Sequence, residues 1–385
     1  MVSSAAQIPK ERKPPAASAD AAAAPACLRI ASFPNVLATN PYQRLLYDEL
    51  AAHGFELAED AHLTLGWLVR SRGGADYLHF HWPQPFWRHE SGPRRQRGPL
   101  SYLKLGLFAA RLAAARLLGY RIAWTIHQVY PHEVESERLD RLGAVVLARF
   151  ANVLVAHDEG TLEAARRDLG RPARRVTVIP HGSYIGVYPE GRGRGDVREE
   201  LGIPGESFVF LCFGDLRLYK EVARLLTAFS ATELPGAVLV VAGTVCAAEQ
   251  GDAVEAHAAA DPRIRPLLSF VPEERVSELF GAADAAVIAR GDGGTSGSLI
   301  LALSMGVPAV AARTVSYEDL LDGGAGGWLF EPGDTASLRA ALEEAAGTDA
   351  EERRRKGESA LRSAERLRWP EIGERTAALL RGDGA

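Results

Sequence analysis

Short apolar runs that alternate with longer, helix-like stretches constrain the fold of this chain more than any other feature. The first series consists of residues 28–33, 77–81, 121–127, 153–157 and 176–179. The second series begins at Phe208 and continues with 237–243, 264–270, 284–289 and 309–311. Such alternation is typical of parallel sheets covered by helices. The sequence therefore predicts an α/β protein with two parallel sheets.

The length of 385 residues is enough for two domains of about 150 to 200 residues, each with its own core. The two series predict an N-terminal domain over 27–190 and a C-terminal domain over 206–365, joined by a polar, glycine-rich linker at 191–205. We expect residues 1–26, rich in alanine, proline and charge, to be disordered. Residues 366–385 are expected to form a C-terminal helix, whose return to the N-terminal domain is left open.

Composition and charge narrow the class of protein. A net charge of −5 argues against a general nucleic-acid binder. No apolar run approaches the ~20 residues that a membrane-spanning helix requires. Cys27, Cys212 and Cys246 are widely spaced and lack metal-ligand spacing, so reduced thiols are expected. We expect a cytoplasmic protein that is soluble, or peripheral at the inner face of the cell membrane.

A glycine-rich turn lies within residues 290–310, between an apolar run and a helical pattern. The turn contains Arg290, Gly291, Gly293, Gly294, Thr295, Ser296 and Gly297. Its glycines let the backbone approach a ligand closely, and Thr295 or Ser296 can cap the helix that follows. Backbone N–H groups and the helix dipole would then face a phosphate or a sugar. An ordinary loop between a strand and a helix is the alternative.

A second turn of the same kind occupies residues 208–220. Gly214 ends the apolar run, and Arg217 and Lys220 come just before a helix expected over 222–229. Cations at a helix N-terminus are disfavoured by the helix dipole, so they need a reason to be there. A guanidinium fork and a lysine point charge together suit a diphosphate. A solvated helix start would explain the same residues without a ligand.

Four further motifs occur in the same chain: HFHWP at 79–83, WTIHQVYPHE at 124–133, IPHGSY at 179–184 and GVPAVA at 306–311. With the two turns, they resemble nucleotide-sugar-dependent glycosyltransferases of the GT-B fold. The resemblance is strongest to bacterial enzymes of glycosyltransferase family 4 type that assemble exopolysaccharides and lipid-linked saccharides. It implies two Rossmann-like domains that face each other across a cleft. The N-terminal domain would take the acceptor, and the C-terminal domain would take the donor.

The resemblance also implies roles for residues of both turns. Gly214, Arg217 and Lys220 match the positions that hold the donor diphosphate, and the segment from Gly294 to Leu301 matches the part that holds the donor sugar and ribose.

One departure from the family concerns two carboxylates. Many retaining members carry two glutamates eight positions apart, where this chain has Gly293 and Leu301. The chain is more similar to a branch that includes inverting β-mannosyltransferases, and the stereochemistry is left open.

Two residues after the strand expected at 121–127 are candidates for catalysis. His127 ends this run, and a neutral imidazole can accept a proton from an acceptor hydroxyl or bond to the donor sugar. The resemblance supports His127, because a histidine at this place faces the donor sugar in many relatives. Glu133 is the rival base, since a carboxylate in the same loop can take a proton. A histidine bonded to the loop backbone and a glutamate that caps a helix are the structural alternatives.

Other polar residues follow neighbouring apolar runs. His181 and Gly182 lie near the predicted crossing between domains, where they are candidates for contacts with the donor, and a turn at Pro180 is the alternative. We expect only one of His79 and His81 to face the cleft.

No Asp-x-Asp pair follows a strand, so we predict neither a metal nor a cofactor. Arg217, Lys220 and helix dipoles would carry the charge of the leaving diphosphate.

Residues 85–125 hold eight basic residues and one acidic residue, Glu90. Leucine and phenylalanine recur at helical spacing within this region, and Lys104 and Arg111 fall between them. A basic amphipathic helix fits an anionic membrane surface or a polyprenyl-diphosphate acceptor. A helix packed on the domain through its leucine face is the alternative.

The sequence therefore predicts a hexosyltransferase that needs no metal. Its donor would be a nucleoside-diphosphate sugar, GDP-mannose or a UDP-hexose. Its acceptor would be a saccharide hydroxyl, on a free saccharide or a polyprenyl-diphosphate-linked one, and nucleic acid is not expected as a partner. A GT-B binding subunit without turnover and a GT-B epimerase are the alternatives.

Overall fold

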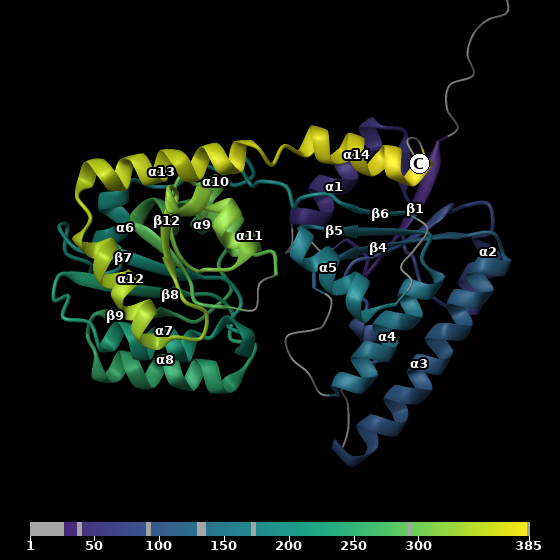
Figure 1. Cartoon of the computed structure of the whole chain (residues 1–385), viewed down its shortest axis with the longest axis horizontal. Coiled ribbons are helices and arrows are strands. Elements are labelled where there is room, and N and C mark those ends of the chain that lie inside the picture. Colours follow the sequence, from purple (N-terminus) through teal and green to yellow (C-terminus); the bar gives the residue numbers. More distant parts are fainter. Residues whose placement is uncertain are drawn as a thin grey trace, which may run out of the picture.

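The computed structural model describes residues 27–36, 41–89, 94–128, 136–170, 175–291 and 294–382, and two six-stranded sheets organise them (Figure 1). All the strand pairs in both sheets are parallel. The prediction of an α/β protein with two parallel sheets is confirmed. The disorder expected for residues 1–26 lies outside the described residues.

The first sheet has the strand order β2-β1-β3-β4-β5-β6. Its strands are β1 (Leu28–Phe33), β2 (Phe55–Leu57), β3 (Tyr77–Phe80), β4 (Arg121–Ile126), β5 (Val153–Ala156) and β6 (Arg175–Val178). Five of them coincide with the predicted apolar runs. The short edge strand β2 was not predicted, because only Phe55 of its three residues is buried and no alternating pattern can develop.

Helices cover both faces of the first sheet. The helices are α1 (Pro41–Ala52), α2 (Leu65–Arg70), α3 (Arg94–Leu117), α4 (Glu137–Phe150), α5 (Glu159–Asp168) and α14 (Trp369–Arg381), with a 3-10 turn, η1, at Gln84–Phe86. One core lies under α2, α3, α4 and α5, and a second core lies under α1 and α14. Successive strand residues point to opposite faces, so Ile30 packs in the second core and Ala31 in the first.

The second sheet has the strand order β12-β11-β10-β7-β8-β9. Its strands are β7 (Phe208–Phe213), β8 (Ala237–Ala242), β9 (Ile264–Leu267), β10 (Ala285–Ile288), β11 (Ala309–Ala312) and β12 (Gly327–Phe330). Its helices are α6 (Arg194–Glu200), α7 (Val222–Ser230), α8 (Ala248–Ala260), α9 (Glu273–Ala282), α10 (Gly297–Ser304), α11 (Val315–Leu320), α12 (Thr335–Gly347) and α13 (Ala350–Glu365). Two 3-10 turns are η2 (Leu218–Lys220) and η3 (Asp322–Gly324). The helix predicted over 222–229 is α7, whereas the edge strand β12 was not predicted.

The chain crosses between the two sheets twice, and the two crossings are tied together. The indole N–H of Trp369 donates to the Ser183 carbonyl at 2.7 Å, and the Ser183 N–H donates to the Leu367 carbonyl at 2.9 Å. A Cβ at Gly182 would lie 2.2 Å from the Trp369 ring, so only glycine fits there. We call this group, residues 182–184 with 367–369, the crossing clamp.

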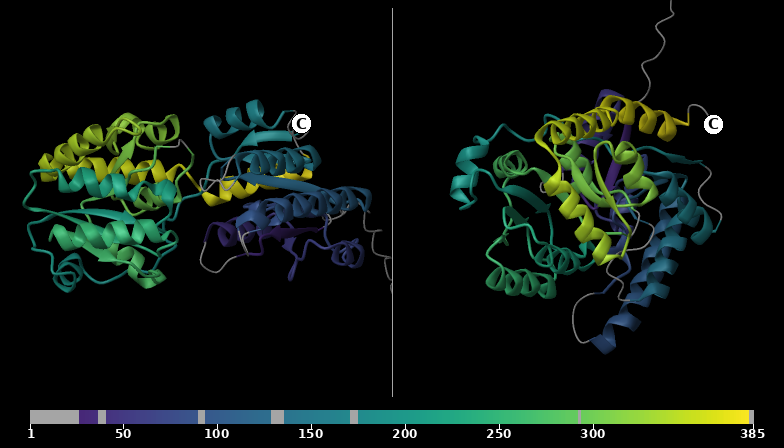
Figure 2. Two further views of the ribbon diagram at one scale, coloured as in Figure 1. Left: turned by 90° about the horizontal axis from the view of Figure 1, so that it is seen from below. Right: turned by 60° about the vertical axis from the view of Figure 1, so that its left-hand side comes forward.

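Beyond the clamp, α14 packs against α1 of the first sheet, as Figures 1 and 2 show in yellow beside purple. The C-terminal helix therefore returns to the N-terminal half of the protein. Residues 191–205, expected as a linker, contain α6, which packs against α9. The exact domain boundaries stay a prediction.

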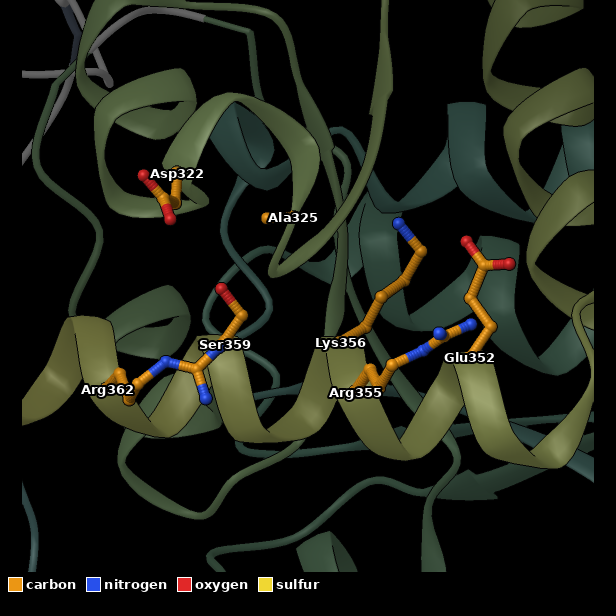
Figure 3. A pocket seen from close by; sticks show the side chains of 7 residues that line it. All are labelled: Asp322, Ala325, Glu352, Arg355, Lys356, Ser359 and Arg362. Carbon is orange, nitrogen blue, oxygen red and sulfur yellow. The ribbon is translucent and has the colours of Figure 1, made fainter.

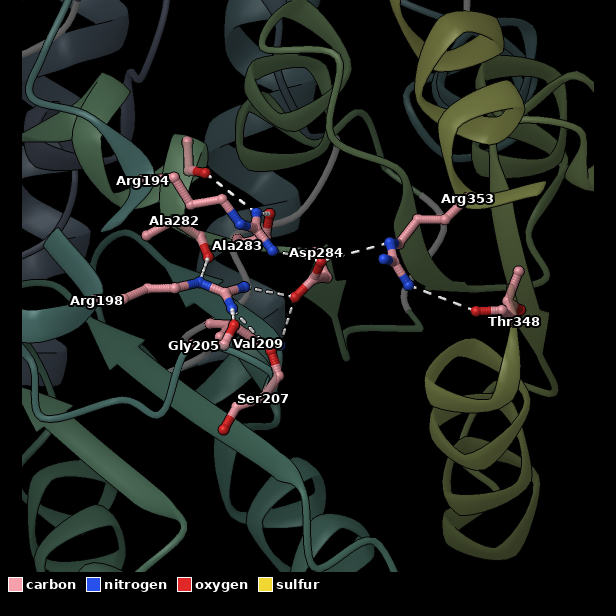
Figure 4. A network of polar contacts seen from close by, with 11 residues as sticks. Arg194, Arg198, Gly205, Ser207, Val209, Ala282, Ala283, Asp284, Thr348 and Arg353 are labelled. Atoms are coloured by element: carbon pink, nitrogen blue, oxygen red, sulfur yellow. Dashed lines mark hydrogen bonds and ion pairs between the residues drawn. The ribbon is translucent and has the colours of Figure 1, made fainter. Parts of the chain in front are cut away.

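A buried ion network holds the start of β10 in place (Figure 4). The Asp284 carboxylate accepts from Arg198 at 2.7 Å, from Arg194 at 2.6 Å and from the Val209 N–H at 2.8 Å. Arg353 of α13 pairs with the same carboxylate at 3.4 Å. Since Asp284 and Arg198 are both buried, each needs the other for charge compensation. The network thus joins α6, α13, β7 and β10.

A surface pocket of about 330 Å³ lies between α13 and η3 (Figure 3). Lys356 lines it and donates to the carbonyls of Gly324 and Gly327, while its ammonium lies 5.2 Å from the centre of the Trp328 ring. Lys356 therefore holds β12 against α13.

Replacing Asp284 should destabilise the C-terminal half strongly. Asp284→Ala leaves the buried Arg198 guanidinium without its counter-charge, so we expect a loss of about 3–5 kcal/mol in the free energy of unfolding. Denaturant titration measures it. Glu351→Ala is the matched control, because Glu351 pairs with Arg354 on the surface, and it should leave the midpoint nearly unchanged. Equal midpoints for the two variants would contradict the role of the network.

Candidate active site

Two turns that the sequence singled out lie side by side at the carboxyl edge of the second sheet. We call residues 214–220, after β7, the first seat, and the described residues after β10, 290–291 and 294–297, the second seat. The strands β7 and β10 are neighbours in the sheet, so their carboxyl ends meet. In the first seat Gly214 has φ +99°, which favours glycine. A Cβ there would also lie 2.7 Å from the Lys220 ammonium nitrogen, so a side chain at this position would displace the lysine.

Lys220 joins the two seats. Its ammonium donates to the Phe213 carbonyl at 3.0 Å and to the Ser298 hydroxyl of α10 at 3.3 Å. The Ser298 hydroxyl also donates to the Phe213 carbonyl at 3.2 Å. Burial lowers the pKa of Lys220, and the neighbouring Cys212 and Asp215 oppose that shift. The structure therefore places one partly desolvated cation where both glycine turns converge.

Arg217 of the first seat faces a carboxylate. Its guanidinium lies 3.4 Å from the Asp215 carboxylate, and both side chains are about half exposed. An exposed pair of this kind contributes little to stability, so a phosphate could compete for the guanidinium. The predicted contact of Arg217 with a diphosphate stays a prediction.

The second seat contains a buried arginine and a capped helix. Ser296 is the N-cap of α10, and its hydroxyl accepts from the Leu299 N–H at 3.2 Å, so Ser296 rather than Thr295 caps this helix. Arg290 is buried and its guanidinium lies 5.0 Å from the centre of the Tyr219 ring. A Cβ at Gly294 would lie 3.2 Å from the same guanidinium. Arg290 therefore approaches both the first seat and its own turn.

Thr295 reaches across to the first sheet. Its hydroxyl donates to the Asp158 carboxylate at 2.6 Å. Asp158 is the N-cap of α5 and also accepts from the Thr161 N–H and hydroxyl. Many retaining family members carry glutamates at the positions of Gly293 and Leu301. Leu301 is buried in the core, and Gly293 lies outside the described residues. A carboxylate from the N-terminal half thus contacts the second seat, and sequence reasoning had not singled it out.

Histidines form a row along the carboxyl edge of the first sheet. His81, His127, His157 and His181 follow the adjacent strands β3, β4, β5 and β6, and His79 lies within β3. His127 is half-buried and the other four are buried. Its Nε2 lies 3.2 Å from His81 Nδ1, and its Nδ1 lies 3.3 Å from His157 Nε2. We call these five residues the histidine row.

Burial keeps the rings of the row neutral. It lowers the pKa of His79 and of His181 to about 3, and it also lowers the pKa of His81, His127 and His157. Neighbouring imidazoles add to the effect at His127. Near neutral pH each ring therefore has one nitrogen that donates and one that accepts.

The expectation that only one of His79 and His81 would face the cleft is wrong. Their ring centres lie 4.2 Å apart, and the Tyr47 hydroxyl is 3.0 Å from a nitrogen of each. Side chains two positions apart in a strand point to the same face, which the sequence reasoning misjudged.

Aromatic rings surround His127. Trp82 stacks on it at 4.3 Å between ring centres, and Tyr42 of α1 meets it edge-on at 4.9 Å. Trp87, by contrast, is a core residue whose indole N–H donates to Asp140 at 3.0 Å.

His181 and Gly182 lie at the crossing clamp. His181 Nδ1 is 2.8 Å from the Gly182 carbonyl, and its Nε2 is 3.5 Å from the Tyr184 hydroxyl. The Tyr184 N–H donates to the Ser304 hydroxyl of α10 at 2.8 Å. Both residues therefore lie where the two halves meet, and their contact with a donor stays a prediction. Glu133 lies outside the described residues.

Among the described residues, no group of three or more histidine, cysteine, aspartate or glutamate side chains is arranged to hold a metal ion. No described helix is both long and apolar enough to span a membrane.

Comparison with known proteins agrees with the predicted resemblance. Residues 194–362 match the family described as "Glycosyl transferases group 1". A "GDP-mannose:glycolipid 4-beta-D-mannosyltransferase" of Xanthomonas campestris pv. campestris is 28% identical over 300 residues, which span 76% of this chain and 75% of the relative.

Solved structures share the fold. A sucrose-phosphate synthase from Thermosynechococcus elongatus has a TM-score of 0.70 at 15% identity, over 92% of this chain and 98% of that one. Anabaena HepE, in complex with UDP and glucose, has a TM-score of 0.68 at 18% identity, over 92% and 100%. WaaG, a glycosyltransferase involved in lipopolysaccharide biosynthesis, has a TM-score of 0.64 at 14% identity, over 92% and 100%. The predicted GT-B fold is confirmed.

Loss of the Lys220 charge should weaken the binding of a nucleoside diphosphate. Lys220→Ala removes the cation at which both seats converge, and we expect affinity to fall by about 1.5–3 kcal/mol, as for a lost charge-assisted bond. Titration calorimetry with GDP and UDP measures it. Arg339→Ala, on the surface of α12, is the control and should bind normally. Unchanged affinity in Lys220→Ala would place the diphosphate elsewhere.

Proposed function

We propose that this protein, which carries a glycosyltransferase group 1 domain over residues 194–362, transfers a hexosyl unit from a nucleoside-diphosphate sugar to a saccharide hydroxyl. The acceptor is proposed to be lipid-linked. The single observation that carries the proposal is the Lys220 ammonium, held between Phe213 and Ser298 where two glycine turns meet. A fixed cation at such a place favours the charge that develops on a departing diphosphate.

Positive charge and helix geometry support the donor site. Arg290 lies close to Gly294, and the N-terminus of α10 begins at the second seat. Backbone N–H groups at a helix N-terminus bind anions, and a buried guanidinium adds a charged donor. These groups offer a way to stabilise a leaving diphosphate without a metal ion, so metal independence is part of the proposal.

The acceptor is proposed to bind at the carboxyl edge of the first sheet. His127 is the one member of the histidine row that is half-buried rather than buried, and the Trp82 ring stacked on it suits a sugar face. His127 or Glu133 would accept the hydroxyl proton, since Leu301 of α10 is packed in the core at a position where many retaining family members carry a glutamate.

The proposed donor sugar is taken from the name of the Xanthomonas relative. The Xanthomonas protein is named for GDP-mannose and a glycolipid, and it covers most of this chain. GDP-mannose is therefore the proposed donor and a lipid-linked saccharide the proposed acceptor.

A membrane surface is the proposed place of the reaction. Helix α3 buries Phe108 and Leu112 but exposes Leu100, Leu103 and Leu107. The alternative, a helix packed on the domain through its leucine face, therefore holds for part of the apolar residues of α3 and not for the others. Exposed leucines in a basic region suit an anionic bilayer. The side chains of Arg94, Arg95 and Arg97 lie outside the described part of the chain. Cytoplasmic location at the inner face of the membrane stays a proposal.

Removing His127 should separate catalysis from binding. If it accepts the proton, His127→Ala should lower turnover about 10²–10⁴-fold and leave nucleotide affinity nearly intact, because a base acts mainly in the transition state. Mass-resolved product analysis with GDP-mannose, UDP-glucose and a lipid-linked saccharide measures transfer. The matched control is His257→Ala, since His257 lies in α8, away from the row, and bonds to the Ala253 carbonyl of its own helix. Tight donor binding with no product from any pair would instead favour a binding subunit.

Exposed leucines of α3 should be needed for membrane binding. Leu103→Glu with Leu107→Glu should reduce cosedimentation with vesicles of anionic lipid, and added salt should weaken the wild type, since exposed charges are screened over about 10 Å at 0.1 M. Val315→Glu, at an exposed residue of α11, is the control. If neither salt nor the leucine replacements change the amount of protein that cosediments, α3 does not bind the membrane.

A further inference from the structure

Four members of the histidine row, His79, His81, His127 and His157, form with Tyr47 a hydrogen-bonded chain of fixed direction. The fifth, His181, bonds to Gly182 and Tyr184 instead. The first fixed point of the hydrogen-bonded chain is the contact of His157 Nδ1 with the Ile179 carbonyl at 3.0 Å. A carbonyl can only accept, so this nitrogen carries the proton and donates. In a neutral ring the other nitrogen, Nε2, must then be an acceptor. His157 is thereby set as its Nδ1–H tautomer.

The same reasoning passes to the next two rings. His157 Nε2 accepts, so His127 Nδ1, 3.3 Å away, must donate to it. His127 Nε2 is then an acceptor, and His81 Nδ1, 3.2 Å away, donates to it. His127 and His81 are therefore also Nδ1–H tautomers.

Tyr47 links His81 to His79 and continues the same order of donors and acceptors. His81 Nε2 accepts the hydroxyl proton of Tyr47 at 3.0 Å, and the Tyr47 oxygen accepts from His79 Nδ1 at 3.0 Å. His79 Nε2 then accepts from the Thr125 hydroxyl at 2.9 Å. Each step has one donor and one acceptor, so the direction from Thr125 to Ile179 satisfies every group in the chain.

We propose that the row fixes His127 as its Nδ1–H tautomer and so makes Nε2 the nitrogen that takes the proton from the acceptor hydroxyl. This inference rests on the proposed glycosyl transfer. His157 is the positioning residue, because its Nε2 holds the His127 Nδ1–H and it does not itself touch the substrate.

The proton step follows from this arrangement. The acceptor hydroxyl takes the place of His81 at His127 Nε2, and its oxygen can accept the N–H that His81 releases. As the oxygen attacks the anomeric carbon, the O–H proton moves to His127 Nε2, and the bond from that carbon to the diphosphate breaks with its electron pair leaving on the diphosphate. The His127 imidazolium then donates from both nitrogens, and His157 Nε2 accepts one of these bonds.

The rings packed against the row carry no charge, so they leave the imidazoles neutral until the proton arrives. These uncharged neighbours are Tyr42 and Tyr47 of α1, Trp82 after β3 and the crossing-clamp residue Trp369, whose ring centre lies 6.4 Å from that of His181. Asp158, next to His157 in sequence, is a carboxylate that raises the pKa of His157 against the effect of burial. Asp158, which also accepts from Thr295, therefore partly offsets the effect of burial on the ring that accepts from His127.

Nitrogen NMR tests the tautomers without any substrate. In ¹⁵N-histidine-labelled protein, two-bond and three-bond correlations identify which nitrogen of each ring carries the proton. We expect Nδ1–H for His79, His81, His127 and His157, against a mixed pattern for the exposed His62. Nε2–H in His127 or His81 would overturn the proposal. Because this measurement needs no donor, it stands even if glycosyl transfer is not found.

Two replacements of His157 test its role in turnover. His157→Phe removes the acceptor for His127 Nδ1–H, and we expect kcat to fall about 10²-fold with nucleotide affinity unchanged. His157→Gln offers an amide oxygen at the place of Nε2, and we expect it to recover a substantial part of kcat. The His127 signals should leave the Nδ1–H pattern in the Phe variant and keep it in the Gln variant. Equal kcat in the two variants would contradict a positioning role. A merely structural effect would lower kcat whether or not the new side chain offers a hydrogen-bond acceptor to His127.

Discussion

The crossing clamp holds the two sheets in one arrangement, and the geometry of the candidate site depends on it. The Trp369 indole bonds to the Ser183 carbonyl, and its ring fills the space that a side chain at Gly182 would need. Both passages of the chain between the sheets meet there, so the carboxyl edges of the sheets are held close together. Thr295 can then reach Asp158 from the other half of the protein.

Charge is divided between the two halves of the site. The C-terminal half supplies cations, with Lys220 at the meeting of the seats and Arg290 buried beside them. The N-terminal half supplies imidazoles that burial keeps neutral. This division suits the proposed chemistry, because a leaving diphosphate needs positive charge whereas a proton acceptor such as His127 needs a free lone pair.

Neutrality of the histidine row has a structural consequence of its own. Buried imidazoles without partners would be costly, yet the chain from Thr125 through Tyr47 to His157 gives each nitrogen a partner. The hydrogen bonds therefore determine the orientation of each ring as well as the nitrogen that carries its proton. Such pre-set geometry is what a site needs when bond formation and proton transfer must coincide.

Local sequence patterns were sufficient for most of the fold. Apolar runs of three to seven residues between helical stretches predicted nearly every strand, since buried parallel strands need a continuous apolar surface. The edge strands β2 and β12 were not predicted, because the first buries only Phe55 and the second begins at a glycine. Within the site, Gly214 and Ser296 were also predictable, because a turn and a helix cap depend on residues close in sequence.

What the sequence by itself determined was the fold class, the two glycine turns and the chemistry that each residue brings. Only the tertiary structure decided which of those residues meet. His127 lies 46 positions from His81 and 30 positions from His157, to both of which it bonds, and Thr295 lies 137 positions from Asp158. Strand order and the crossing clamp bring them together, and both arise from packing over the whole chain rather than from any local pattern.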